Sequence, residues 1–195
     1  GAPIQHAIIN GEKETGITIM YTDKGMDSGD IIKEEKIIIN ENDTYDIISE
    51  KMSKLGAKLL KEVLPKILNN TAPRQKQDDT QKTIAPIIKK EDEHLDFNNP
   101  VQKVHNKIRG LSSVPGTYAI LNNNRIKLLT SEITNITTNK KPGTITKIEK
   151  DGIYISCQDK EIKITKLQVS GKKQVSVKDY INGIKKEELL GQELK

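Results

Sequence analysis

The chain has 195 residues, of which 34% are hydrophobic and 30% are charged, with a formal net charge of +5. This length fits one large domain or two small ones. No apolar run approaches the roughly 18 residues of a transmembrane helix, and the first residues lack the pattern of a signal peptide. The single cysteine, Cys157, excludes an internal disulfide and a cysteine-based metal cluster. We therefore expect a cytoplasmic protein that binds no metal and no membrane.

Charge is distributed unevenly along the chain. Residues 1–97 contain 14 Lys and Arg against 18 Asp and Glu, a net charge of −4. Residues 98–195 contain 18 Lys and Arg against 9 Asp and Glu, a net charge of +9. A basic C-terminal half favours a polyanionic partner such as RNA, although a lysine-rich solvated surface has the same composition.

The first elements in chain order are a helix and two strands. Pro3 suits the first turn of a helix, which Asn10-Gly11 would end. Apolar and β-branched residues predict a strand over residues 15–22 and a second strand over residues 31–39. Lys and Glu in the middle of the second strand indicate an edge or surface position.

The loop between these strands is a candidate functional site. It reads Asp23-Lys24-Gly25-Met26-Asp27-Ser28-Gly29-Asp30. Glycines let a backbone close tightly on a ligand, and aspartates can accept hydrogen bonds or act as a base. Reactive loops held on rigid strands are common sites, but a solvated Asx-type hairpin turn has the same composition.

A long helix and a linker follow. Asn42-Asp43-Thr44 is a signal for a helix N-terminus. The apolar residues after it keep a helical spacing that predicts a core-facing stripe, namely Ile48, Met52, Leu55 and Leu59. Pro65 lacks an N–H and predicts a kink or a split near Val63-Leu64. Residues 69–83 contain few apolar side chains and predict an exposed linker.

The second half begins with a helix after Asn99-Pro100 and continues as short strands. Residues 122–125 and 150–152 are hairpin turn signals. The apolar alternation shifts phase near Thr165-Lys166, which predicts a β-bulge, and Ser176-x-x-Asp179 resembles a capping box. Five or six short strands with a helix suggest a small barrel of the oligonucleotide-binding (OB) type.

The loop resembles the signature of the folate-dependent formyltransferases, Asp-x-Gly-Leu-Asp-Thr/Ser-Gly-Asp, and Asp27 falls on the family's catalytic aspartate. Upstream, Gly16-Ile17-Thr18-Ile19 matches the family's Thr-Gly-Val-Thr-Ile strand. The segment Gly1–Gln5 resembles the one after the family's His-x-Ser-Leu-Leu-Pro-x-Trp-Arg. Similarity continues through the linker, and it fits best the members that act on methionyl-initiator tRNA.

The resemblance implies two domains joined by a linker. Residues 1–70 would be the C-terminal part of a Rossmann-like α/β catalytic domain, and residues 71–90 the linker. Residues 91–195 would form a mainly β, OB-like domain with flanking helices that binds tRNA. Ile88-Lys89-Lys90 and Leu95-Asp96-Phe97 match the family's junction between linker and second domain.

The resemblance also implies a reaction, the transfer of a formyl group from 10-formyltetrahydrofolate to the amino group of methionyl-initiator tRNA. We expect a monomer that serves translation initiation. In the family an Asn and a His stabilise the developing oxyanion, and the aspartate matching Asp27 orients the His and an ordered water. No Asn-x-His motif occurs in these 195 residues, which resemble the last two-thirds of the family. We therefore expect the chain alone to be inactive.

The candidate site residues follow from matching positions. The resemblance gives Asp27 the catalytic role. Candidates for binding the formyl donor are Thr22, Asp23, Gly25, Met26 and Asp27. Candidates for phosphate contacts with tRNA are Lys82, Lys89, Lys90, Lys107, Arg109, Lys140, Lys141, Lys172 and Lys173.

Two other functions fit the same residues. One is a formyltransferase for sugar nucleotides, against which the basic C-terminal half and the long linker argue. The other is a non-catalytic RNA-binding module in which the loop at residues 23–30 is structural. Folate binding that depends on Asp27 would separate the enzymes from the module. Preference for tRNA over a nucleotide sugar would separate the two enzymes.

Overall fold

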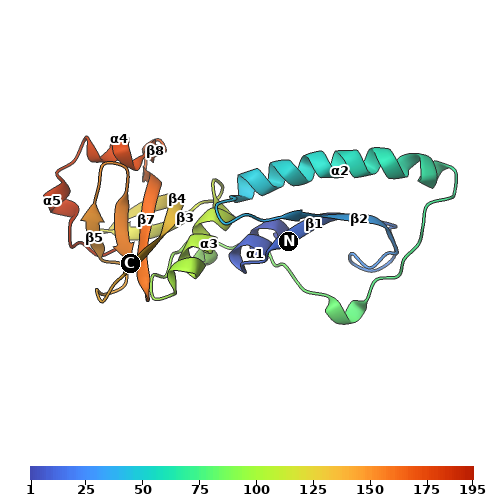
Figure 1. Cartoon of the computed structure of the whole chain (residues 1–195), viewed down its shortest axis with the longest axis horizontal. Helices are drawn as coiled ribbons and strands as arrows, with labels where there is room; N and C mark the ends of the chain where they lie inside the picture. The colour runs from blue at the N-terminus through green and yellow to red at the C-terminus, as the bar shows by residue number, and fades with distance from the viewer.

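Two groups of elements lie at opposite ends of an elongated molecule in the computed structural model, which describes all residues from 1 to 195 (Figure 1). The N-terminal group consists of α1 (Pro3–Ile9), β1 (Glu14–Met20), β2 (Ile31–Ile38) and α2 (Tyr45–Leu68). β1 and β2 pair as an antiparallel hairpin. The expected first helix and both strands are confirmed, with strand ends shifted by one or two residues.

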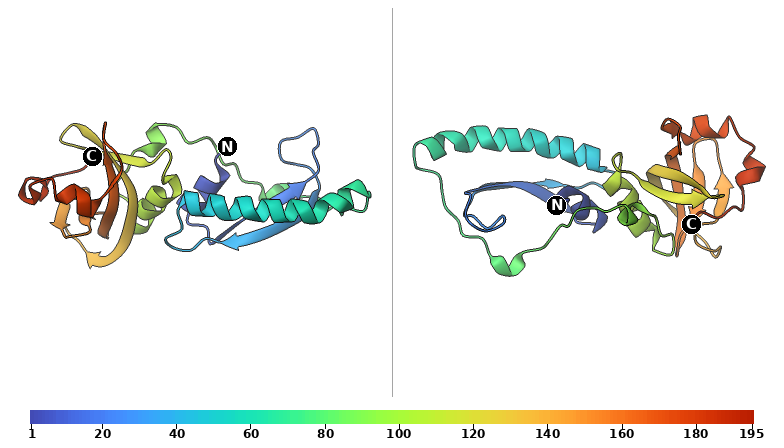
Figure 2. Two further views of the ribbon diagram at one scale, coloured as in Figure 1. Left: turned by 90° about the horizontal axis from the view of Figure 1, so that it is seen from above. Right: turned by 180° about the vertical axis from the view of Figure 1, so that it is seen from behind.

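Helix α2 covers one face of the hairpin (Figures 1 and 2). It is capped by Thr44, whose side chain accepts a hydrogen bond from the Ile47 amide at 3.4 Å. The expected core stripe is confirmed as buried, namely Ile48, Met52, Leu55 and Leu59. The expected split near Pro65 is wrong, because α2 continues to Leu68. Pro65 and Lys61 are both exposed, so the Lys61 carbonyl, which lacks an N–H partner, can bond to water.

The linker leaves the far end of α2, runs below the hairpin in Figure 1 and returns to the middle of the molecule. It contains a short 3-10 turn, η1 (Asp79–Gln81), and a second one, η2 (Glu91–Glu93), follows it. Most of its side chains are exposed, as expected. It is nevertheless tied to the hairpin, because Gln75 and Ile31 exchange backbone hydrogen bonds of 2.7 and 3.0 Å.

The C-terminal group begins with α3 (Val101–Leu111), which packs on an antiparallel six-stranded sheet. The further elements are β3 (Thr117–Leu121), β4 (Asn124–Thr137), β5 (Ile145–Ile148), β6 (Ile153–Ser156), β7 (Lys160–Val169), β8 (Val175–Ser176), α4 (Val177–Ile181) and α5 (Lys186–Leu189). The strand order is β3-β4-β7-β6-β5, with β8 paired to β7. A closed barrel is not confirmed, because β3 and β5 do not pair. Residues 191–195 hydrogen-bond to both Ile120 of β3 and Ile145 of β5.

Local signals in this half are confirmed. Asn122 and Asn123 have φ values of +50° and +62°, the left-handed pair typical of a tight hairpin turn. The β4–β7 register passes from Thr130–Lys166 to Ser131–Ile164, which leaves Thr165 unpaired in a bulge. The capping motif is confirmed at the start of α4, where the Ser176 hydroxyl accepts from the Asp179 amide at 3.1 Å.

Most of the buried apolar surface lies in the C-terminal group. Its core cluster contains 19 buried residues, whereas the cluster between α1, β2 and α2 contains 4. Because stabilisation scales with the apolar area removed from water, we expect the C-terminal group to contribute more hydrophobic stabilisation than the N-terminal group. Cys157 belongs to the larger cluster, where burial raises the pKa of its thiol to about 12 and makes it unreactive.

The two groups meet where α1 crosses α3. Gly110 permits this contact, because a Cβ there would lie 2.8 Å from Ile9 Cγ1. His105 lies between the groups, with Nδ1 2.9 Å from Ser131 Oγ and Nε2 3.0 Å from the Glu41 carbonyl oxygen. Burial lowers the pKa of His105, which favours a neutral ring with a structural role.

Candidate active site

The loop between β1 and β2 is closed at its base and braced from within. The Tyr21 amide donates to the Asp30 carbonyl at 2.9 Å. Inside the loop, one oxygen of the Asp23 carboxylate accepts from the Gly25 amide at 2.9 Å and from the Ser28 hydroxyl at 2.8 Å. This is the Asx-type turn that the composition allows, so the turn chemistry fixes the loop without excluding a functional role.

Asp27 has an unusual backbone conformation. Its φ is +54°, in the left-handed region that side-chain-bearing residues seldom adopt. Two residues later, a Cβ at Gly29 would lie 1.6 Å from the Tyr21 carbonyl oxygen, so only glycine fits. The Asp27 side chain is exposed, and its carboxylate makes no hydrogen bond or ion pair within the chain. An exposed carboxylate without a partner in the chain can accept a proton or orient a neighbouring donor.

The linker holds the loop from the side. Gln77 Nε2 donates to the Asp27 carbonyl at 3.0 Å and to the Gly29 carbonyl at 2.7 Å. The guanidinium carbon of Arg74 lies 3.6 Å from the centre of the Tyr21 ring. These contacts join segments that are far apart in sequence: Gln77 follows Asp27 by 50 residues and Gly29 by 48.

Two further linker contacts reach the same loop. Arg74 Nη1 lies 3.3 Å from Asp30 Oδ2, and Lys82 Nζ lies 3.5 Å from the Met26 carbonyl oxygen. Nothing in the sequence marks Arg74 or Gln77 as site residues, because a polar segment with few apolar residues predicts exposure and nothing more. A contact between residues so far apart has no local sequence signal.

The residues expected to bind the formyl donor lie together on this loop. Asp23 and Gly25 are joined by the hydrogen bond described above, and Thr22 and Met26 are exposed beside them. The Met26 side chain is 81% exposed, so the loop presents an apolar side chain next to the carboxylates. Whether they bind the donor stays a prediction.

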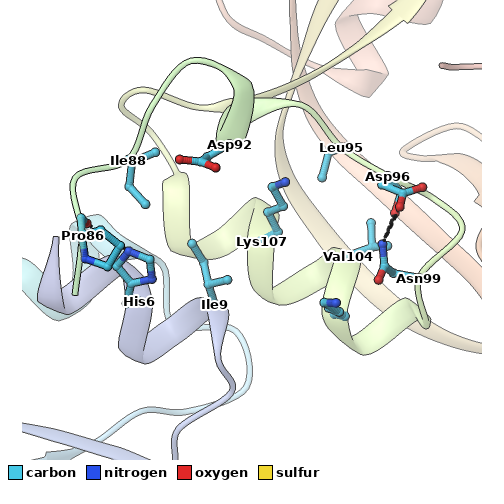
Figure 3. A pocket seen from close by; sticks show the side chains of 11 residues that line it. His6, Ile9, Pro86, Ile88, Asp92, Leu95, Asp96, Asn99, Val104 and Lys107 are labelled. Carbon is cyan, nitrogen blue, oxygen red and sulfur yellow. Dashed lines mark hydrogen bonds between the residues drawn. The ribbon is translucent and has the colours of Figure 1, made fainter. Parts of the chain in front are cut away.

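A pocket of about 380 Å³ lies elsewhere, between α1, the linker and α3 (Figure 3). Its apolar wall includes Ile9 and Val104, and two of its basic groups bond to backbone carbonyls. His6 Nε2 lies 3.0 Å from the Pro86 carbonyl oxygen, and Lys107 Nζ donates to the His94 carbonyl at 2.7 Å. The pocket contains none of the loop residues, so it belongs to the junction between the two groups.

Seven of the basic residues expected to contact tRNA are exposed, namely Lys82, Lys89, Lys90, Lys140, Lys141, Lys172 and Lys173. The two pairs in the C-terminal group lie apart from each other. Lys140-Lys141 follows β4 near the start of β7, because Thr137 pairs with Lys160. Lys172-Lys173 follows the end of β7. β7 has 10 residues, so the pairs are about 30 Å apart along the strand.

The structure does not place Arg109 on the basic surface that the sequence predicted. Its residue is only 6% exposed, and Nη1 donates to the carbonyls of Asn40 and Asp43, both at 3.0 Å. Its guanidinium therefore ties α3 to the N-terminal group and is not presented on the surface. Lys107 is half-buried, and burial lowers the pKa of its amine, which also bonds to the chain.

Family models match both groups of elements. Residues 87–185 match the model described as formyl transferase, C-terminal domain, and residues 1–64 match the model described as formyl transferase. The chain therefore belongs to the formyltransferase family. It is 43% identical over 184 residues to the methionyl-tRNA formyltransferase of Staphylococcus aureus (strain MW2), which covers 94% of this chain and 59% of the relative. The chain thus spans about three-fifths of the length of the curated relatives it matches.

Solved structures share the fold. An N-formyltransferase from Helicobacter canadensis, in complex with folinic acid and dTDP-3-aminofucose, superposes with a TM-score of 0.64 at 26% identity, over 81% of this chain and 58% of that one. HypX from Aquifex aeolicus, in complex with tetrahydrofolic acid, superposes with a TM-score of 0.72 at 16% identity, over 93% and 32%. At that identity the second likeness shows the fold alone. No helix here combines the length and apolar content needed to cross a bilayer.

Proposed function

We propose that this chain forms part of a methionyl-tRNA formyltransferase, which moves a formyl group from 10-formyltetrahydrofolate to methionyl-initiator tRNA. The amino nitrogen of methionine bonds to the formyl carbon. The bond from that carbon to N10 of the folate breaks, and the leaving tetrahydrofolate takes up the proton that the amine loses. Asp27 assists this proton transfer, because its carboxylate can accept a proton or orient a proton donor beside the reacting centre. The observation that carries the proposal is the exposed Asp27 carboxylate on its braced, left-handed turn.

Thr22, Asp23, Gly25 and Met26 would hold the donor beside Asp27. The similarity to a methionyl-tRNA formyltransferase supports the tRNA partner, as do the exposed lysines of the basic half. The proposed division is a catalytic part over 1–70, a linker over 71–90 and an RNA-binding part over 91–195. The hydrogen bonds that residues 191–195 make to both edge strands support an OB-like barrel for the last part.

The 195 residues alone are proposed to be inactive, because no Asn-x-His motif occurs in them to stabilise the oxyanion. The test therefore uses a form of the protein that carries this motif. Asp27→Asn should lower kcat by roughly a hundredfold or more, because it removes a proton acceptor at the reacting centre. Formylation of methionyl-tRNA is followed directly.

The matched control is Asp79→Asn, an exposed aspartate of η1 outside the loop, which should retain wild-type turnover. Circular dichroism should show the same fold for both variants. An Asp27→Asn protein with unchanged kcat would refute the assignment.

The second candidate is a sugar-nucleotide formyltransferase. The structural likeness to the Helicobacter canadensis enzyme, whose complex contains dTDP-3-aminofucose, favours it. Competition between methionyl-tRNA and a dTDP-amino sugar in one assay separates the two enzymes. We expect formylation of the tRNA, because the net charge of +9 over residues 98–195 suits a polyanion. Exclusive formylation of the sugar would favour the second candidate.

A further inference from the structure

One amide side chain connects the linker to the backbone around Asp27. The –NH₂ group of Gln77 has two hydrogens, and besides the Met20 sulfur it has two backbone carbonyls of the loop as acceptors. These are the carbonyls of Asp27 and Gly29, at 3.0 and 2.7 Å. The side chain is half-buried, and Met20 Sδ lies 3.6 Å from the same nitrogen. Gln77 therefore fixes the backbone immediately after the left-handed residue, on both sides of Ser28.

Gln77 is itself held in place from both sides. Two residues before it, Gln75 pairs with Ile31 of β2 through two backbone hydrogen bonds. Immediately after it, the Asp78 carboxylate accepts from the Thr80 amide at 3.0 Å and from the Thr80 hydroxyl at 2.6 Å. The Gln77 side chain thus belongs to a short segment that is anchored to strand β2 on one side and to a capped turn on the other.

We infer that Gln77 is a positioning residue, which keeps Asp27 in its left-handed conformation and so directs the Asp27 carboxylate. The hydrogen bond that Gln77 donates to Asp27 uses the backbone carbonyl and leaves the carboxylate exposed. The linker is then part of the active site. The consequence for catalysis rests on the proposed function, whereas the effect on the loop does not.

The first experiment measures the loop directly in the 195-residue chain. Two amides report on it, Tyr21 bonded to Asp30 and Gly25 bonded to Asp23. Gln77→Ala should increase hydrogen exchange at both amides on the order of tenfold, because two hydrogen bonds that close the loop are lost. The control is Gln75→Ala, which removes an exposed side chain and keeps the backbone pairing; exchange should not change.

A second variant separates hydrogen bonding from packing. Gln77→Glu keeps the size of the side chain but has no hydrogens to donate when ionised. It should loosen the loop as much as Gln77→Ala does. Wild-type exchange in Gln77→Glu, or in both variants, would overturn the inference.

The catalytic consequence is measured in the form that carries the Asn-x-His motif. Gln77→Ala and Gln77→Glu should lower kcat about tenfold and leave KM for tRNA unchanged, since the group acts on the chemical step and not on RNA contacts. A loosened loop with wild-type kcat would overturn the positioning role. If Asp27→Asn also keeps full turnover, the proposed function fails, while the exchange data still support the contact of Gln77 with the loop.

Discussion

At the scale of single residues, Arg109 combines a charge with an interior position. Its two bonds to the carbonyls of Asn40 and Asp43 close the start of the segment that leads into α2. Asp43 adds a negative charge nearby. Burial opposes its ionisation, but hydrogen bonds from Lys51 and Asn40 lower the pKa of its carboxyl overall. The charge of Arg109 is therefore compensated within the protein.

Replacing Arg109 should weaken folding more than RNA binding. Arg109→Ala removes the guanidinium donor from the Asp43 carbonyl in a buried contact, while the Asn40 carbonyl still accepts from the Asp43 amide. The loss should lower the free energy of unfolding by about 3 kcal/mol. Urea denaturation of the 195-residue chain measures this. The control Lys173→Ala, on an exposed turn, should stay within about 0.5 kcal/mol of wild type. Unchanged stability together with weaker tRNA binding would restore the original interpretation of Arg109 as an RNA contact.

At the scale of elements, α2 remains a single helix although Pro65 lies inside it. Its buried stripe ends at Val63, where the split was expected, and the exposed last turn continues to Leu68. Pro65 removes one backbone hydrogen bond, but the rest of the last turn remains, with the Asn69 amide bonded to the Pro65 carbonyl at 3.0 Å. The helix therefore passes the proline at an exposed position, at the cost of one backbone hydrogen bond.

Pro65→Ala should stabilise the protein. The substitution restores the N–H that can bond to the Lys61 carbonyl and relieves the contact of the ring with the preceding turn. Part of the gain is offset by the greater freedom of alanine in the unfolded chain, so we expect about 1–2 kcal/mol. Urea denaturation is again the measurement, with Leu68→Ala as a control on the same exposed surface. A loss of stability would show that α2 needs the proline.

At the scale of the whole molecule, sequence patterns predicted elements better than contacts between them. Helical and strand periodicity located α1, β1, β2 and α2, and the turn residues located the hairpins and the bulge at Thr165. The loop around Asp27 was identified by its motif. Its partner Gln77 was not, because the two residues are brought together only by the return path of the linker. The burial of Arg109 was missed for the same reason: its partners lie 66 and 69 residues away.

The separation of the two lysine pairs along β7 makes a prediction about RNA binding. Pairs about 30 Å apart cannot contact the same phosphate, so each should contribute independently. Reversing Lys172-Lys173 to Glu should weaken tRNA binding about tenfold and flatten its salt dependence. Reversing Lys140-Lys141 should weaken it less, because Lys141 already pairs with Glu193 at 2.6 Å.

Combining the four reversals should multiply the two losses of affinity. Titration with tRNA at several salt concentrations measures them. Reversing the exposed Lys54 and Lys61 of α2 controls for total charge and should change affinity least. If only one pair matters, the RNA lies across one end of the sheet. If neither pair matters, the expected RNA surface is wrong and the linker lysines Lys89 and Lys90 become the next to test. Multiplied effects would mean instead that the RNA runs along the sheet from one end of β7 to the other.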